Sequence, residues 1–256
     1  MLTGTRRCLV AKAKTEKATR QKRMNGLIFG PPKIGKTHLL GTAAFDERTA
    51  PIAMLDFEGG VLDVLEDMPG FGTDLIHIPV TSWDELNEAY SRIEENEEGF
   101  KSVGIDSISE THIFALLNIL DEEHERREAK GENTDLIQQG DYGTALVQLR
   151  RLVRYFRDLP LHTFFTSHSK DEIVTKEGMV KMPSMAGKAA TEIPGLMTLV
   201  GYLTMEDRED GGVRTLLLDP EEFPRIRIGA RAGWGTEIPK QIDDPTITAI
   251  LDAFHY

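Results

Sequence analysis

The chain has 256 residues, of which 40% are hydrophobic and 28% are charged. This length and composition are typical of one soluble globular domain and exclude two large ones. No apolar run approaches the roughly 20 residues that span a bilayer, and the single cysteine, Cys8, excludes a disulfide within the chain. We therefore expect a cytoplasmic protein that makes no membrane contact.

The formal net charge of −12 is divided unevenly along the chain. Residues 1–25 hold eight lysines and arginines against one acid, Glu16, so this segment carries +7 and the rest carries −19. We expect residues 1–24 to form a basic N-terminal arm that is partly disordered, and residues 25–256 to form one domain. The arm is either solvated or in contact with a phosphate backbone. The acidic body argues against a protein coated in nucleic acid.

Short apolar runs alternate with amphipathic segments, a pattern typical of a mainly parallel sheet with helices on its faces. Strands are expected at residues 25–29, 51–57, 74–80, 101–106 and 161–167. Helices are expected at residues 35–44, 82–93, 109–127 and 144–158. Ser82 and Glu85 form a capping box at the start of the second helix.

The remainder of the chain has weaker periodicity. Residues 128–143 and 168–192 predict two loops, and a loop as long as the second is usually functional or disordered. Late strands are expected at residues 197–205, 213–219 and 224–228, the first two as an antiparallel hairpin. A short helix at residues 246–254 closes the chain. The predicted fold class is therefore α/β, with a mainly parallel central sheet and late antiparallel strands.

One segment, Gly30-Pro31-Pro32-Lys33-Ile34-Gly35-Lys36-Thr37, fits the phosphate-binding pattern G-x-x-x-x-G-K-[ST] at every fixed position. It follows a predicted strand and opens a predicted helix, as phosphate binding requires. The glycines let backbone N–H groups surround the phosphates, Lys36 supplies a positive charge, and Thr37 supplies a hydroxyl for Mg²⁺. We predict that these eight residues and the adjacent His38 bind ATP together with Mg²⁺.

Polar residues at three other strand ends are candidates to complete this site. Asp106 is predicted to support Mg²⁺, and its alternative role is to cap the following helix. Glu58 is predicted to be the base that activates water, with Asp56 as its rival. His168 is predicted to contact the γ-phosphate, and its alternative role is purely structural. No two histidines have the sequence spacing that is typical of metal ligands together with a second-shell partner, so we do not expect histidines to bind a metal.

With these residues in place, residues 24–239 resemble the RecA-like ATPases. They look most similar to the phage-encoded RecA-like proteins of single-strand annealing recombination, the ATP-dependent branch of the Sak proteins. The resemblance is carried by Leu55-Asp56-Phe57-Glu58, Ile105-Asp106-Ser107, the strand that ends in His168 before a long loop, and Arg225-Ile226-Arg227-Ile228-Gly229-Ala230-Arg231. It implies a RecA-like P-loop core in which Glu58 is the catalytic base, Asp106 supports Mg²⁺ and His168, where RecA has glutamine, senses the γ-phosphate.

The resemblance also implies functions outside the P-loop. Arg227 and Arg231 would complete the site of a neighbouring subunit as arginine fingers. Relatives often carry a second basic residue two positions after the first, and this chain has Gly233 there, so the choice between the two arginines stays open.

Two loops, at about residues 128–143 and 169–190, would line a path for single-stranded DNA, unless they are only solvated. The second loop contains Lys170, Lys176, Lys181 and Lys188, with Met179, Met182 and Met185 between them.

The sequence therefore predicts a Mg²⁺-dependent, DNA-stimulated ATPase of RecA-like type. It would bind single-stranded DNA and promote annealing or strand exchange in phage homologous recombination, in the host cytoplasm if phage-encoded. The expected partners are other copies of the chain, in a ring or filament, and a single-strand binding protein. The alternative, favoured by the acidic body, is a RecA-like or AAA+ switch that acts on a protein partner without binding DNA. A metabolic kinase is disfavoured because the chain has no arginine-rich lid segment after the fourth strand.

Overall fold

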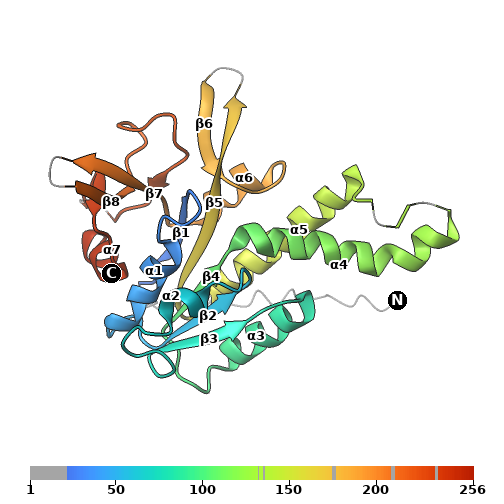
Figure 1. Ribbon diagram of the computed structural model, residues 1–256, viewed down its shortest axis with the longest axis horizontal. Coiled ribbons are helices and arrows are strands. Elements are labelled where there is room, and N and C mark those ends of the chain that lie inside the picture. Colours follow the sequence, from blue (N-terminus) through green and yellow to red (C-terminus); the bar gives the residue numbers. More distant parts are fainter. Residues whose placement is uncertain (1–21, 132, 135, 175–176, 209–210, 234–235) are drawn as a thin grey trace, which may run out of the picture.

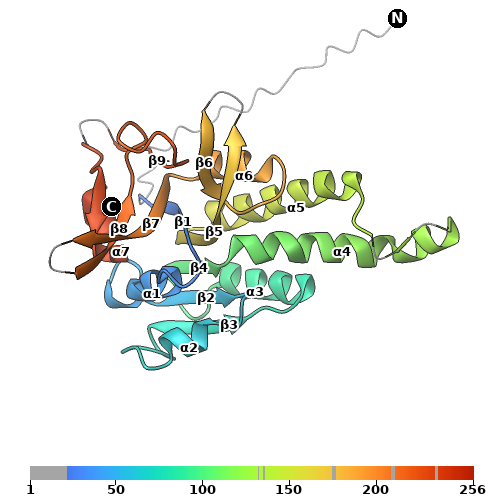
Figure 2. The same cartoon turned by 45° about the horizontal axis from the view of Figure 1, so that its top comes forward.

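The computed structural model describes residues 22–131, 133–134, 136–174, 177–208, 211–233 and 236–256. Residues 1–21, most of the expected basic arm, lie outside this range. The described strands form a sheet with helices on both faces (Figures 1 and 2). In chain order the strands are β1 (Asn25–Gly30), β2 (Ile52–Asp56), β3 (Leu75–Pro79), β4 (Ser102–Asp106), β5 (His162–Val174), β6 (Gly178–Pro183), β7 (Leu199–Arg208), β8 (Gly211–Leu217), β9 (Gly229–Ala230) and β10 (Gln241–Asp243).

The strand order across the described sheet is β10-β8-β7-β1-β5-β4-β2-β3. The five neighbouring pairs from β7 to β3 are all parallel, whereas β8 and β10 add to the other edge in antiparallel fashion. β6 pairs with β5, and β9 pairs with β7, both antiparallel. The predicted fold class, an α/β fold with a mainly parallel central sheet and late antiparallel strands, is confirmed.

The helices are α1 (Lys36–Gly41), α2 (Val61–Leu65), α3 (Trp83–Glu95), α4 (Ile108–Ala129), α5 (Gln139–Asp158), α6 (Ala189–Glu192) and α7 (Ile247–Ala253). Five of the helices, α1, α3, α4, α5 and α7, occupy expected segments, with ends shifted by a few residues, whereas α2 and α6 were not expected. The predicted cap of α3 is confirmed, because the Ser82 hydroxyl accepts from the Glu85 amide, but the Glu85 carboxylate accepts from the amide and hydroxyl of Thr81. None of the described helices is long and apolar enough to cross a membrane.

The central strands are buried on both faces. In β1, Leu27 and Phe29 pack into the core on one face, which includes α3 and α5, while Ile28 packs on the other against α1 and α7. Side chains alternate between faces along a strand, so a strand covered on both sides is apolar throughout. This explains why the runs that predicted these strands were continuous rather than alternating.

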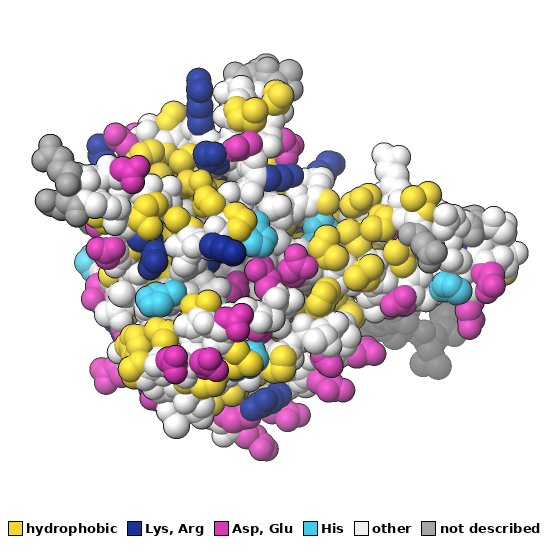
Figure 3. All heavy atoms as spheres, in the orientation of Figure 1, with side chains coloured by type: hydrophobic (Ala, Val, Ile, Leu, Met, Phe, Trp, Pro, Cys, Tyr) yellow, Lys and Arg dark blue, Asp and Glu magenta, His cyan; other side chains and the backbone are white. Residues whose placement is uncertain are grey.

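Helices α4 and α5 form a long hairpin that projects from the sheet (Figure 1). A buried ion pair joins them, with 2.6 Å between Arg127 Nη2 and Asp141 Oδ1, and Arg127 also donates to the carbonyl of Leu136. Space-filling atoms of apolar side chains gather on this hairpin in Figure 3. The exposed large apolar residues on it are Ile113, Leu117, Leu136, Tyr142, Val147 and Tyr155.

The parallel register brings the predicted site residues to one edge of the sheet. Gly30 of β1 lies opposite His168 of β5, and Asp56 of β2 lies opposite Asp106 of β4. We call this line of residues the carboxyl edge. In an open α/β sheet, ligands bind outside the carboxyl ends of the strands.

Two sequence predictions were wrong. Residues 168–192 were expected to form a loop, but β5 continues to Val174 and pairs with β6 in an antiparallel hairpin, which α6 follows. Residues 224–228 were expected to form a strand, but only an isolated bridge between Lys181 and Ile226 forms there. The bridge covers the edge of β6, and regular pairing begins at β9 instead. The late hairpin of β7 and β8 was predicted correctly.

Candidate active site

The segment after β1 has the backbone form of a phosphate-binding loop, and both of its fixed glycines are required by the geometry. A Cβ atom on Gly30 would lie 2.4 Å from the carbonyl oxygen of Leu203, so no side chain fits there. Gly35 has φ of 99°, a left-handed conformation that favours glycine. Pro31 and Pro32 have no backbone N–H, so the loop amides available to phosphate begin at Lys33.

The ammonium of Lys36 is held inside this loop. Its Nζ donates to the carbonyl oxygens of Gly30, at 3.2 Å, and Pro31, at 2.9 Å. Burial lowers the pKa of Lys36, and the nearby carboxylates of Asp106 and Glu58 partly offset this by raising it. The loop therefore places a buried cation beside two acids. His38 lies exposed on α1, and its nucleotide contact stays a prediction.

Asp106 connects the loop to the two central strands. Its Oδ2 accepts from the Thr37 hydroxyl at 2.6 Å, and its Oδ1 accepts from the Thr166 hydroxyl. Burial raises the pKa of this carboxyl, which is 4% exposed, and the two hydroxyls oppose the rise. The helix-capping alternative is excluded because Ser107, not Asp106, caps α4. The Thr37 hydroxyl and the Asp106 carboxylate are hard oxygen ligands of the kind that suit Mg²⁺.

The two rival acids after β2 have different surroundings. Asp56 is 4% exposed and accepts from the backbone amides of Glu58, Gly59 and Val61 and from His77 Nε2. These bonds occupy both carboxylate oxygens of Asp56 and stabilise the turn that follows β2. The side chain of Glu58 is instead 31% exposed and faces the loop. The geometry therefore favours Glu58 over Asp56 as a group that reaches substrate.

Glu58 contacts two residues on neighbouring strands. Its Oε1 accepts from the Ser107 hydroxyl and lies 3.1 Å from His168 Nε2. The backbone amide of His168 donates to Ser109 Oγ, while its Nδ1 is a buried nitrogen without a hydrogen-bond partner among the described residues. The structure thus brings Glu58 and His168 together beside Lys36.

Sequence reasoning did not single out Ser107 or Thr166 as polar contacts of the site. Both are hydroxyl residues at or near the ends of buried strands, the one signal that would have found them.

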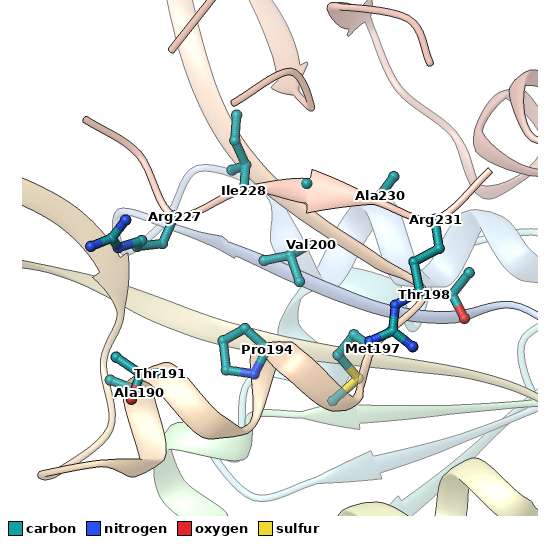
Figure 4. A pocket seen from close by; sticks show the side chains of 11 residues that line it. Ala190, Thr191, Pro194, Met197, Thr198, Val200, Arg227, Ile228, Ala230 and Arg231 are labelled. Carbon is teal, nitrogen blue, oxygen red and sulfur yellow. The ribbon is translucent and has the colours of Figure 1, made fainter. Parts of the chain in front are cut away.

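Arg227 and Arg231 lie away from the loop of their own chain. They stand at opposite ends of a groove of about 550 Å³, with Pro194, Met197 and Val200 between them (Figure 4). The groove runs along β9. Because β9 pairs with the start of β7, and the start of β7 pairs with the first residues of β1, the groove lies toward the amino end of β1. Both guanidinium groups are engaged locally, Arg227 with Glu177 at 2.9 Å and Arg231 with the carbonyl of Gly195 at 2.8 Å. A contribution to a neighbouring subunit stays a prediction.

A search of curated proteins found no match. Among solved structures, the chain is similar to a KaiC-like protein, PH0186, from Pyrococcus horikoshii OT3, with 17% identity over 76% of this chain and 77% of that one and a TM-score of 0.43. It is also similar to the flagellar accessory protein FlaH from Methanocaldococcus jannaschii, with 13% identity over 88% and 87% and a TM-score of 0.46.

A family model described as an AAA domain matches residues 22–223. The matched segment contains the whole phosphate-binding loop, the acids at the carboxyl ends of β2 and β4, and the part of β5 that lies beside the loop. Because this match covers most of the chain, the protein belongs to this AAA-domain family of P-loop ATPases.

Proposed function

We propose that this protein is a Mg²⁺-dependent ATPase whose hydrolytic residues meet at the carboxyl edge. The observation that carries the proposal is the convergence of three groups there: the Lys36 ammonium in its loop, the bonded pair of Thr37 and Asp106, and the pair of Glu58 and His168. These residues come from four separate segments of the chain. Burial of apolar side chains does not require a partly exposed acid, a histidine and a lysine to meet at a phosphate-binding loop. Their convergence therefore indicates a functional site.

The chemistry assigned to this chain is positioning and proton transfer. The loop amides and Lys36 bind the phosphates, and Lys36 balances charge on the γ-phosphate. Mg²⁺, supported by Thr37 and Asp106, neutralises phosphate charge when bound. As the oxygen of a water bonds to the γ-phosphorus, the bond from that phosphorus to the bridging oxygen breaks, and Glu58 accepts the proton of the water. ADP and phosphate are the products.

His168 acts through Glu58 in this proposal. Its Nε2 lies within hydrogen-bond distance of the Glu58 carboxylate, which fixes the direction in which that group faces the water. His168 also lies on β5, the strand that continues outward to the β5–β6 hairpin. A change at the γ-phosphate therefore has a direct physical connection to this hairpin.

The test compares ATP turnover and nucleotide affinity in Glu58→Gln with the wild type. We expect kcat to fall by about 100- to 10 000-fold while the affinity for ATP changes little, because glutamine keeps the shape and loses the base. Glu88→Gln, an exposed acid on α3, is the matched control. Normal turnover in Glu58→Gln would show that another group activates the water.

We propose further that the protein binds single-stranded DNA as a homo-oligomer and promotes annealing or strand exchange, together with a single-strand binding protein. The support is the resemblance to recombination ATPases and the basic residues of the β5–β6 hairpin. The hairpin also carries exposed apolar residues, Ile173 at 77% and Met179 at 52%, which suit contacts with bases.

Other features of the hairpin weaken the DNA interface as first predicted. Lys170 pairs with Glu172 at 2.8 Å and Lys181 with Asp171 at 3.0 Å, so two cations are neutralised. Met182 and Met185 are buried in the core and cannot separate bases; Lys176 lies outside the described residues. These observations favour a second candidate function, an ATP-driven switch in which the exposed Ile173 and Met179 of the hairpin contact a protein partner.

One measurement separates the two functions. We expect single-stranded DNA to raise the ATPase rate of the wild type at low salt and less so at moderate salt, because phosphate contacts release counterions. Lys188→Ala combined with Ile173→Ala should weaken this stimulation and leave the basal rate unchanged. If the ATPase is active but DNA neither binds nor stimulates it at either salt concentration, the protein-partner function replaces the DNA function.

A further inference from the structure

An arginine from the antiparallel edge of the sheet lies against the phosphate-binding loop. Arg214 belongs to β8 and pairs in register with Met205 of β7. A Cβ atom built on Gly35 would lie 2.8 Å from the guanidinium carbon of Arg214 and 3.0 Å from its Nε and Nη2. The guanidinium therefore packs directly on the backbone of Gly35, and a side chain at that position would displace it.

The guanidinium of Arg214 has unused hydrogen-bonding capacity. Its Nε is buried and has no hydrogen-bond partner among the described residues, and no salt bridge of Arg214 occurs among them. On the adjacent strand, Arg208 is fully engaged, with Glu206 at 2.9 Å and Asp243 at 2.7 Å. An unpaired buried donor costs stability, and acids are abundant in a chain of net charge −12. We therefore expect the partner of the Arg214 guanidinium to be a bound anionic ligand.

The position of Arg214 identifies the chemistry of that ligand. The loop has two prolines, Pro31 and Pro32, that cannot donate hydrogen bonds to phosphate. Gly35 and Lys36, which follow, are the residues that pattern and geometry assign to phosphate binding. A guanidinium has a planar set of donors that matches phosphate oxygens. Arg214 is placed to add donors beside Gly35, in a loop whose two prolines supply none.

We propose that Arg214 binds the phosphate chain of the nucleotide held in the loop of its own subunit. This inference rests on the proposed ATPase function. It adds a cation from the β7–β8 hairpin, a different source from the arginines of the groove in Figure 4. It also connects the antiparallel edge of the sheet to nucleotide binding, because a phosphate contact holds β8 against α1.

The experiment uses the full chain and two probes, a fluorescent ADP analogue bound directly and inorganic tripolyphosphate as its competitor. We expect Arg214→Ala to weaken both by roughly 10- to 100-fold, since the lost bond joins two charged groups. Arg214→Lys should recover part of the affinity, because it keeps the charge and loses the planar donors. Arg208→Ala, also in the β7–β8 hairpin and exposed to solvent, is the matched control and should bind both probes like the wild type.

Equal affinity of Arg214→Ala and wild type for both probes would overturn the proposal. Weaker binding of ADP with unchanged tripolyphosphate binding would also overturn it, since the contact would then be with the base or ribose. If Arg214→Ala does not fold, Arg214→Lys decides, with wild-type affinity for both probes counting against the proposal. Failure of nucleotide binding, on which the ATPase function depends, gives a different result, because wild type would then bind neither probe.

Discussion

Two charged regions of this protein, the carboxyl edge and the groove between Arg227 and Arg231, differ in how their groups are satisfied. At the carboxyl edge, Lys36, Asp106 and Glu58 interact with one another and remain near an open loop. In the groove, both arginines bond to groups of their own surroundings. The first region can perform chemistry within one subunit, whereas the second acts on nucleotide only if another subunit supplies it.

The largest effect should come from the carboxyl edge. Lys36→Ala removes the buried cation of the loop, and we expect ATP turnover to fall by roughly a thousandfold or more, together with nucleotide binding. Steady-state phosphate release and direct nucleotide titration measure the two losses. Lys33→Ala, which removes an exposed lysine of the same loop, is the control. It distinguishes a requirement for positive charge at the position of Lys36 from a requirement for positive charge anywhere in the loop. Turnover that survives in Lys36→Ala would mean that the loop does not bind the reacting phosphates.

The next effect tests whether the groove works between subunits. Arg231→Ala should lower turnover by roughly 100- to 1000-fold if Arg231 stabilises charge on the phosphates of a neighbour. Mixing Arg231→Ala with Lys36→Ala subunits should then restore part of the activity, because some junctions combine an intact loop with an intact arginine. The same pair of mixtures made with Arg227→Ala identifies which arginine acts. Mixtures that stay inactive for both arginines would restrict the groove to a structural function.

A smaller effect is expected at the metal-supporting acid. Asp106→Asn keeps an acceptor for the Thr37 hydroxyl and loses the negative charge, so we expect the Mg²⁺ concentration at half-maximal activity to rise about 10- to 100-fold. A Mg²⁺ titration of the ATPase rate gives this number. Asp121→Asn, an exposed acid on α4, should leave the titration unchanged. An unchanged titration for Asp106→Asn would remove the carboxylate from the metal site.

The smallest effect on activity should occur at Asp56. Asp56→Asn disturbs the bonds to the Val61 amide and to His77, and we expect the free energy of unfolding to drop by about 1–3 kcal/mol. Turnover should stay within a few-fold of the wild type, in contrast to Glu58→Gln. Chemical denaturation and ATPase assays at low temperature measure the two properties, with Asp63→Asn on α2 as control. A stable but inactive Asp56→Asn would transfer the function of the base to Asp56.

Local features of the sequence predicted the parts of this protein that depend on neighbouring residues. The apolar runs gave the central strands, and the capping box at Ser82 gave the start of α3. The β5–β6 hairpin was missed because its polar and apolar residues do not alternate regularly. Its pairing is decided by contacts with the core and with the segment around Ile226.

The sequence by itself determined the phosphate-binding loop, the fold class and the acids at the strand ends, because parallel strands in register bring their carboxyl ends to one edge. The tertiary structure alone decided which acid faces the loop. Asp56 and Glu58 are two residues apart, and only the bonds to Gly59, Val61 and His77 distinguish them. The tertiary structure alone also placed Arg214 on Gly35. The pairing of β7 with β8, far from Gly35 in the sequence, creates this contact, and no local pattern encodes it.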